Sequence, residues 1–137
     1  MGMGVRMTCV LAVDPGEARI GVAVSDASGT VARPLTVMRH TSRPSDARAI
    51  LDLAREHQAE AIVVGLALDM EGDVGPQARR ALRLVDALRE LSPITVTTWD
   101  ESGSTRAAQR GRARDAMLDA RAAAVVLQDY LDAQAHS

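Results

Sequence analysis

The stretch from Val10 to Asp26 places the strongest constraint on how this chain folds. It opens within an unbroken apolar run, Cys9 to Val13, which is typical of a strand buried on both faces of a sheet. Asp14 ends the run, Pro15-Gly16 marks a tight turn, and a second strand is predicted from Arg19 to Ser25. The result is a hairpin with one carboxylate at the rim of a sheet. Such an acid is either a turn former or a metal ligand.

The size and composition of the chain limit its class. Its 137 residues predict a single domain over residues 1–137, with residues 1–6 as a disordered tail. No apolar segment approaches the roughly 18 residues of a membrane span, and no signal sequence is apparent, so we expect a cytoplasmic protein that makes no membrane contact. Cys9 is the only cysteine and is expected to be a small core residue. The net charge of −2 excludes a strongly basic protein.

The remaining elements change from hairpins to helical crossovers at Pro44. Before it, a third strand is predicted over Val31–Arg39, and Pro34 favours an edge position for that strand. After it, the chain alternates between helical and strand patterns. The predicted elements are a helix over Pro44–His57, a strand over Ala61–Leu66, a helix that ends at Leu91 and buries Leu82, a strand over Ile94–Asp100, a short helix over Thr105–Arg112, and a last helix that Asp115 caps and that ends near Ala133.

This order of elements predicts an α/β fold. Strands joined by tight turns pair antiparallel, whereas strands joined through helices run parallel. We therefore expect a mixed five-stranded sheet of order 3-2-1-4-5 with helices on both faces. Ligand sites in such sheets lie at the carboxyl ends of the parallel strands. Three acidic segments reach that edge, namely Asp14, the loop Leu68–Gly72 and Asp100-Glu101. Their convergence indicates a functional site.

A set of short motifs runs along nearly the whole chain. They are Asp14-Pro-Gly16 with Arg19-Ile-Gly-Val-Ala23, Ala32-Arg-Pro-Leu35, Ile62-Val-Val-Gly-Leu66 with Leu68-Asp-Met-Glu-Gly72, Gly75-Pro-Gln-Ala78, Asp100-Glu101, and Asp119-Ala-Arg-Ala-Ala123 with Leu127-Gln-Asp-Tyr-Leu131. In these motifs and in their order, the chain resembles the YqgF/RuvX family of RNase H-like proteins, which are described as Holliday junction resolvases or as nucleases that mature pre-16S ribosomal RNA.

The resemblance implies an RNase H-like fold with a metal-binding triad of Asp14, Glu101 and Asp119, and with Asp100 as a neighbouring ligand. The metal would be Mg²⁺ or Mn²⁺, which oxygen ligands suit and which serve phosphodiester hydrolysis. Alternation along the strand puts Trp99 and Glu101 on one face and Asp100 on the other, so spacing leaves open which acid faces Asp14.

The implied activity is that of a hydrolase acting on phosphodiester bonds of structured nucleic acid. Pre-16S rRNA processing in ribosome biogenesis is the expected role, and a four-way DNA junction is the alternative substrate. We expect a monomer or homodimer. Phosphate contacts are expected from arginines between the acids, although arginines on a helix often form only a solvated face. These arginines are Arg106, Arg110, Arg112 and Arg114.

Several residues carry weaker predictions. Asp69 is either a further metal ligand or a solvated loop acid. His40, His57 and His136 are scattered and are expected to be ordinary surface residues. A non-catalytic RNase H-like binding module is a further alternative, because Ser102-Gly-Ser-Thr105 follows Glu101 where the family has an arginine. An actin-like ATPase is disfavoured, since that fold needs two such domains and the chain has room for one.

Overall fold

The computed structural model describes residues 8–101 and 117–135. In these ranges the chain forms five strands and three helices. The elements are β1 (Val10–Pro15), β2 (Arg19–Ser25), β3 (Ala32–Arg39), α1 (Arg43–Glu56), β4 (Ala61–Leu66), α2 (Pro76–Leu91), β5 (Thr95–Asp100) and α4 (Leu118–Ala135). Their bounds agree with the sequence prediction to within two residues wherever both ends are described. The predicted helix Thr105–Arg112 and the predicted cap Asp115 lie outside the described residues.

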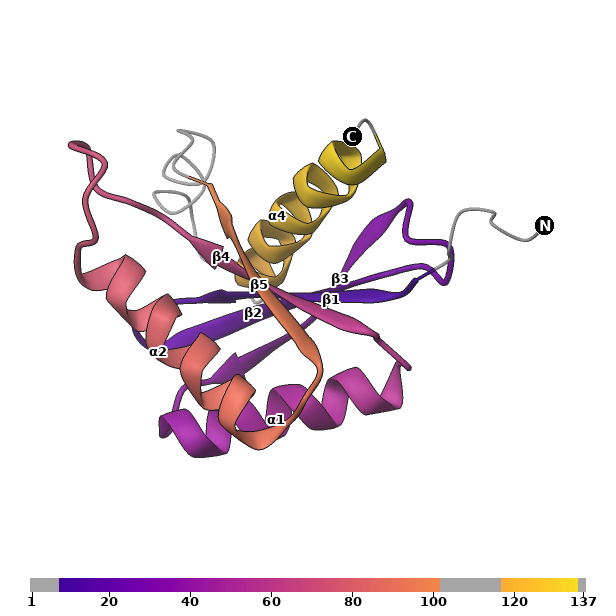
Figure 1. Cartoon of the computed structure of the whole chain (residues 1–137), viewed down its shortest axis with the longest axis horizontal. Coiled ribbons are helices and arrows are strands. Elements are labelled where there is room, and N and C mark those ends of the chain that lie inside the picture. Colours follow the sequence, from indigo (N-terminus) through magenta and orange to yellow (C-terminus); the bar gives the residue numbers. More distant parts are fainter. Residues whose placement is uncertain (1–7, 102–116, 136–137) are drawn as a thin grey trace.

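The five strands form one sheet of order β3-β2-β1-β4-β5, as predicted (Figure 1). The pairs β1–β2 and β2–β3 are antiparallel, whereas β1–β4 and β4–β5 are parallel. Pro34 lies in the edge strand β3, opposite Ala23 and beside a register shift in the pairing. An edge strand tolerates proline because one of its sides needs no backbone N–H donor.

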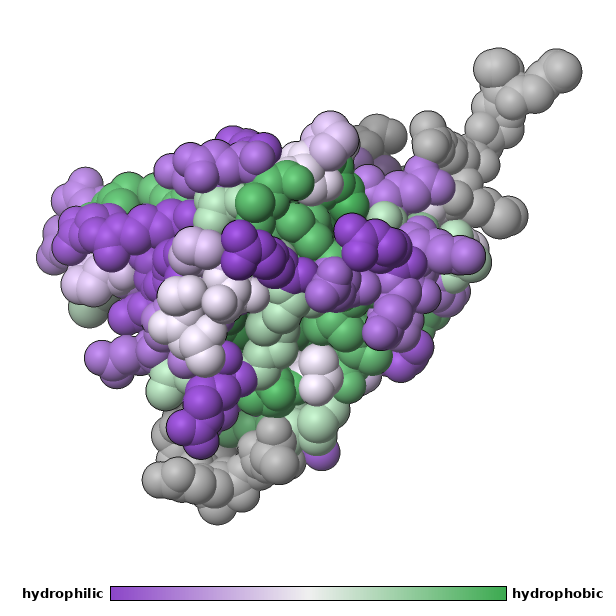
Figure 2. All heavy atoms as spheres, turned by 90° about the horizontal axis from the view of Figure 1, so that it is seen from below, coloured by the Kyte–Doolittle hydropathy of each residue, from purple (hydrophilic) through white to green (hydrophobic). Residues whose placement is uncertain are grey.

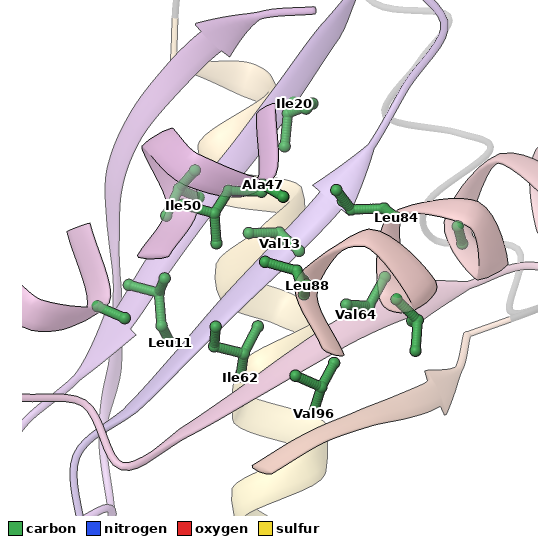
Figure 3. Close-up of a cluster of buried hydrophobic side chains, with 14 of the residues drawn as sticks. Leu11, Val13, Ile20, Ala47, Ile50, Ile62, Val64, Leu84, Leu88 and Val96 are labelled. Atoms are coloured by element: carbon green, nitrogen blue, oxygen red, sulfur yellow. The ribbon is translucent and has the colours of Figure 1, made fainter. Parts of the chain in front are cut away.

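The sheet separates two hydrophobic layers. On one face, α1 and α2 pack over side chains that include Leu11, Val13 and Val64 (Figure 3). On the other face, α4 packs over Ala12, Ala23 and Val63. Figure 1 shows α4 on one side of the sheet, with α1 and α2 on the other. Because adjacent strand residues point to opposite faces, this division identifies the face of every strand residue near the sheet edge.

The outer side of α1 and α2 is largely hydrophilic. Figure 2 views the molecule from this side and shows hydrophilic side chains with hydrophobic ones between them. The prediction that α2 buries Leu82 is wrong: Leu82 is 37% exposed, whereas Leu84 is fully buried. Leu82 has helical spacing from Ala78 and Val85, whereas Leu84 has it from Ala81 and Leu88, and the buried face of α2 is centred on the second set.

None of the helices in the described ranges is long and apolar enough to cross a membrane.

Candidate functional site

Asp14 is a buried carboxylate near the end of the central strand β1. It is 5% exposed and lies opposite Gly21 of β2 in the antiparallel pairing. Ala12, two residues earlier, packs in the α4 layer, so Asp14 faces α4 as well. On the other side of β1, the last pair with β4 is Val13 with Val64, which puts Gly65 beside Asp14 one residue further on. Asp14 thus lies between two glycines on the α4 face.

Gly21 makes room for the first turn of α4. A Cβ atom at Gly21 would lie 1.9 Å from the backbone carbonyl oxygen of Asp119, so no residue with a side chain fits there. Directly opposed residues in an antiparallel pair have Cβ atoms roughly 4.5–5.5 Å apart, which brings the Asp119 backbone within about 8 Å of the Asp14 Cβ. Asp119 therefore begins α4 next to Asp14.

Gly65 makes room for the side chain of Glu101. A Cβ atom at Gly65 would lie 2.7 Å from Oε2 of Glu101. That oxygen is shielded from solvent, and the Glu101 backbone N–H donates to the carbonyl of Leu66 at 2.8 Å. The choice between the two acids that the sequence leaves open is therefore settled geometrically: Glu101 lies on the α4 face with Asp14. Asp100 is exposed and, by alternation, points to the other face, so it is not brought to this cluster.

Asp119 carries an ion pair with Arg19, the first residue of β2. Nε of Arg19 donates to Oδ2 of Asp119 at 2.8 Å, and the two side chains are 59% and 34% exposed. In residues 8–101 and 117–135, no three His, Cys, Asp or Glu side chains are gathered closely enough to hold a metal ion as they stand. The three predicted acids thus share one face and one edge, and the carboxylate of Asp119 is held by an arginine.

Gln77, in the first turn of α2, ties the edge of the site together. Its Oε1 accepts from the backbone N–H of Ala67 at 3.1 Å, and its Nε2 donates to the carbonyl of Pro15 at 3.3 Å. One side chain therefore joins the last residue of β1 to the segment that follows β4. Sequence reasoning gave Gln77 no role, and its only signal there is membership in the Gly75–Ala78 motif.

Asp69 shapes the loop after β4. Its Oδ1 accepts from the backbone N–H of Glu71 at 3.0 Å and of Asp73 at 2.8 Å. The Asp69 N–H donates to the carbonyl of Asp73 at 2.9 Å, which closes the same loop. These hydrogen bonds give Asp69 the role of a turn former in this loop.

His40 is not an ordinary surface residue, contrary to the prediction. Its Nδ1 lies 2.5 Å from Oδ2 of Asp46, whose side chain is only 1% exposed. Asp46 also accepts from the Thr41 backbone N–H at 3.1 Å and from Arg43 at 3.3 Å. The cluster fixes the β3–α1 connection.

The structure describes Trp99 but not the predicted phosphate-binding arginines. Trp99 is partly buried against the α4 layer, edge-on to Tyr130 with ring centroids 5.7 Å apart. The predicted phosphate-binding arginines all lie outside the described residues. They are Arg106, Arg110, Arg112 and Arg114.

Comparison with known proteins identifies the family of the chain. A model of the RuvX family, described as Holliday junction resolvase, matches residues 8–133. A protein of Roseiflexus sp. (strain RS-1), named pre-16S rRNA nuclease, is 44% identical over 133 residues, which cover 91% of this chain and 94% of that protein. A protein of the same name from Caldanaerobacter subterraneus is 38% identical over 138 residues, with 93% and 99% covered.

The fold also matches a solved structure. T. thermophilus RuvC in complex with Holliday junction substrate superposes with a TM-score of 0.61 at 16% identity, over 93% of this chain and 96% of that one. At this identity the likeness shows the fold, which is the RNase H-like fold expected from the motifs. Because the family model spans most of the chain and the relatives align over nearly their whole lengths, this chain belongs to the RuvX family, a family of nucleases.

Proposed function

We propose that this chain is a divalent-metal-dependent nuclease that processes pre-16S rRNA, with Asp14, Glu101 and Asp119 as its catalytic carboxylates. One observation carries the proposal. The two residues beside Asp14 on the α4 face are both glycines, and the space at each is taken by a segment carrying another acid. Three acids from a strand end, a second strand end and a helix start are thereby collected at the ligand-binding edge of the sheet.

The residues present fit a hard divalent cation. The donor set consists of carboxylate oxygens alone, which Mg²⁺ and Mn²⁺ prefer over nitrogen and sulfur. Gly65 forms a cradle that a Cβ would fill, and Glu101 extends into it. Burial holds Asp14 in place, whereas Asp119 at 34% exposure has room to turn. Asp14, Glu101 and Asp119 would hold the ions.

Each residue of the site has a physical task. Divalent cations bound there would lower the pKa of an attacking water and neutralise the charge that develops on the leaving oxygen. Asp14, fixed in the sheet, anchors the site. Gln77 holds the end of β1 and the segment after β4 together through Pro15 and Ala67. Arg106, Arg110, Arg112 and Arg114 are proposed to contact backbone phosphates, which position the substrate without reading its sequence.

Two sources support the substrate class. The relatives that cover nearly the full length of this chain are named pre-16S rRNA nuclease, which supports structured RNA. The description of the family model names a Holliday junction, which makes branched DNA the competing substrate. Both substrates require the same phosphodiester chemistry, so the site residues do not distinguish them.

Asp14→Asn tests the metal site. Removing one of several neighbouring anions relieves repulsion, so the variant should fold with an unchanged or slightly higher melting temperature in chelator. It should lose nuclease activity by several orders of magnitude, and Mn²⁺ should raise its melting temperature less than that of the wild type. Asp100→Asn is the matched control, because that acid faces away from the cluster. An Asp14→Asn protein that cleaves like the wild type would exclude the catalytic assignment.

A cleavage panel tests the substrate. Labelled single-stranded RNA, a pre-16S rRNA-like hairpin and a four-way DNA junction are incubated with wild type and Asp14→Asn in Mn²⁺. Cleavage of the hairpin by the wild type alone supports the rRNA assignment. Preferred cleavage of the junction would move the assignment to branched DNA. Absence of cleavage in all three would favour a binding module.

A further inference from the structure

Arg19 belongs to the machinery of the site, although neither its position in a motif nor the family resemblance gave it a role. It is the first residue of β2, and the tight turn after β1 fixes its backbone, because its carbonyl accepts from the Gly16 N–H at 2.8 Å. By alternation with Gly21 it lies on the α4 face. Its Nε holds Oδ2 of Asp119 at 2.8 Å. The residue therefore reaches one of the three proposed metal ligands from within the sheet edge.

The surroundings of Arg19 favour an anion. Arg19 is paired directly with Arg39 of β3, so two cations face each other across the strands. Like charges in that arrangement are destabilising unless an anion lies nearby. In the metal-free protein, the carboxylate of Asp119 is that anion. A guanidinium carries five N–H donors in a fixed fork, and the bond to Asp119 uses only Nε. The remaining donors match phosphate oxygens.

We propose that Arg19 has two successive partners: it holds Asp119 in the metal-free protein, and it binds a substrate phosphate once the carboxylate of Asp119 serves as a metal ligand. The inference rests on the proposed function. Arg19 is 59% exposed, so its side chain has room to turn outward without breaking the core. Loss of its carboxylate partner would leave Arg19 and Arg39 facing each other, and a phosphate restores the balance of charge. Arg19 thus excludes metal in one state and recruits substrate in the other.

This exchange predicts that Arg19→Gln binds Mn²⁺ more tightly and RNA more weakly than the wild type. In Arg19→Gln, the carboxylate of Asp119 loses the cation that competes with the metal, so the Mn²⁺ concentration at half-saturation should fall by roughly two- to fivefold, the range expected for an exposed ion pair. Binding of an RNA hairpin in Ca²⁺, which takes the same oxygen ligands, should weaken, and the salt slope should drop by about 1. Titration calorimetry gives the first value, and fluorescence anisotropy gives the second.

Two matched variants separate this role from simpler ones. Arg39→Gln removes the same charge at the same edge without releasing Asp119, so its Mn²⁺ half-saturation should fall less. Arg55→Gln breaks an exposed ion pair with Asp52 on α1, in the opposite layer, and should change neither measurement. Equal Mn²⁺ half-saturation in Arg19→Gln and Arg39→Gln would overturn the exchange. Weaker binding of both Mn²⁺ and RNA in Arg19→Gln would overturn it too, because Arg19 would then only support the fold.

The same experiment distinguishes failure of the inference from failure of the proposed function. If Mn²⁺ does not bind the wild type, or binds Asp14→Asn equally well, the acids do not form a metal site and both proposals are overturned. If Mn²⁺ binds the wild type through Asp14 and Arg19→Gln changes nothing, only the exchange at Arg19 is overturned.

Discussion

Gly21 and Asp119 approach each other so closely that β2 and α4 touch backbone to backbone. A Cβ at residue 21 would lie 1.9 Å from the Asp119 carbonyl oxygen, 2.3 Å from its carbonyl carbon and 3.0 Å from the Ala120 nitrogen. Backbone atoms at the start of a packed helix have no rotamer by which to yield. The contact therefore fixes both the position of α4 and the place of Asp119 beside Asp14.

Gly21→Ala should consequently destabilise the whole domain. Overpacking against backbone costs about 1–3 kcal/mol or more, so we expect a loss near the upper end and a melting temperature lower by roughly 10 °C. Gly75→Ala is the control, since its added methyl would meet only Asp69, with Cβ at 3.8 Å and Oδ2 at 3.9 Å, which are ordinary contacts. Urea denaturation of both variants measures the difference. Equal stabilities would mean that α4 is free to shift.

Gly65→Ala should weaken metal binding while leaving the stability of the fold almost unchanged. The nearest atom to the added methyl is Oε2 of Glu101, the far end of a flexible side chain, and Val126 Cγ2 follows at an ordinary 3.5 Å. Stability should therefore change by less than about 1 kcal/mol. The carboxylate of Glu101 would be displaced, so the rise in melting temperature with Mn²⁺ should shrink toward that of Asp14→Asn. A normal Mn²⁺ response would show that Glu101 is not a ligand.

The sheet could be predicted from sequence because its signals are local. The apolar run before Asp14, the Pro15-Gly16 turn and the change of period at Pro44 specify which strands pair antiparallel and which cross over through helices. Chirality and strand direction then leave few orders for the sheet. The edge at which the acids meet follows from the same argument, since parallel strands present their carboxyl ends together.

The finer features depend on tertiary contacts that spacing does not encode. Leu82 and Leu84 lie on opposite sides of the apolar stripe of α2, and only packing against the sheet decides that Leu84 is the buried one. Alternation groups Glu101 with Trp99, but the register across β1, β4 and β5 decides that this face is the one with Asp14. The roles of Gly21 and Gly65 depend on what approaches them from elsewhere in the chain.

Asp26 should make stability depend on pH in acid. The backbone N–H of Thr30 is the main cause that lowers the pKa of Asp26 from 3.8 to about 2, with help from Val31 and Ser28. A carboxyl group whose pKa is lower in the folded state stabilises the fold above its unfolded pKa, and this contribution is lost as the pH falls through the folded pKa. The stability difference between wild type and Asp26→Ala should be constant above about pH 5, and its charge-dependent part should shrink through the folded pKa and be gone by about pH 1. Urea denaturation across this range measures it, and a difference that does not vary with pH would contradict the assignment.

Asp69 should stabilise its loop through the acceptor oxygen of its side chain, and two substitutions distinguish this role from metal binding. Its Oδ1 accepts from the N–H groups of Glu71 and Asp73, and asparagine offers the same acceptor oxygen without the charge. Asp69→Asn should therefore keep the stability of the wild type within about 0.5 kcal/mol and keep its Mn²⁺ half-saturation. Asp69→Ala removes both bonds and should cost about 1 kcal/mol, since the loop is exposed and water replaces part of what is lost. If Asp69 were a metal ligand, Asp69→Asn would still fold normally but would raise the Mn²⁺ concentration at half-saturation, as Asp14→Asn does. Calorimetric titration of the asparagine variant alone decides between the two roles, because in that variant charge is the only property that changes.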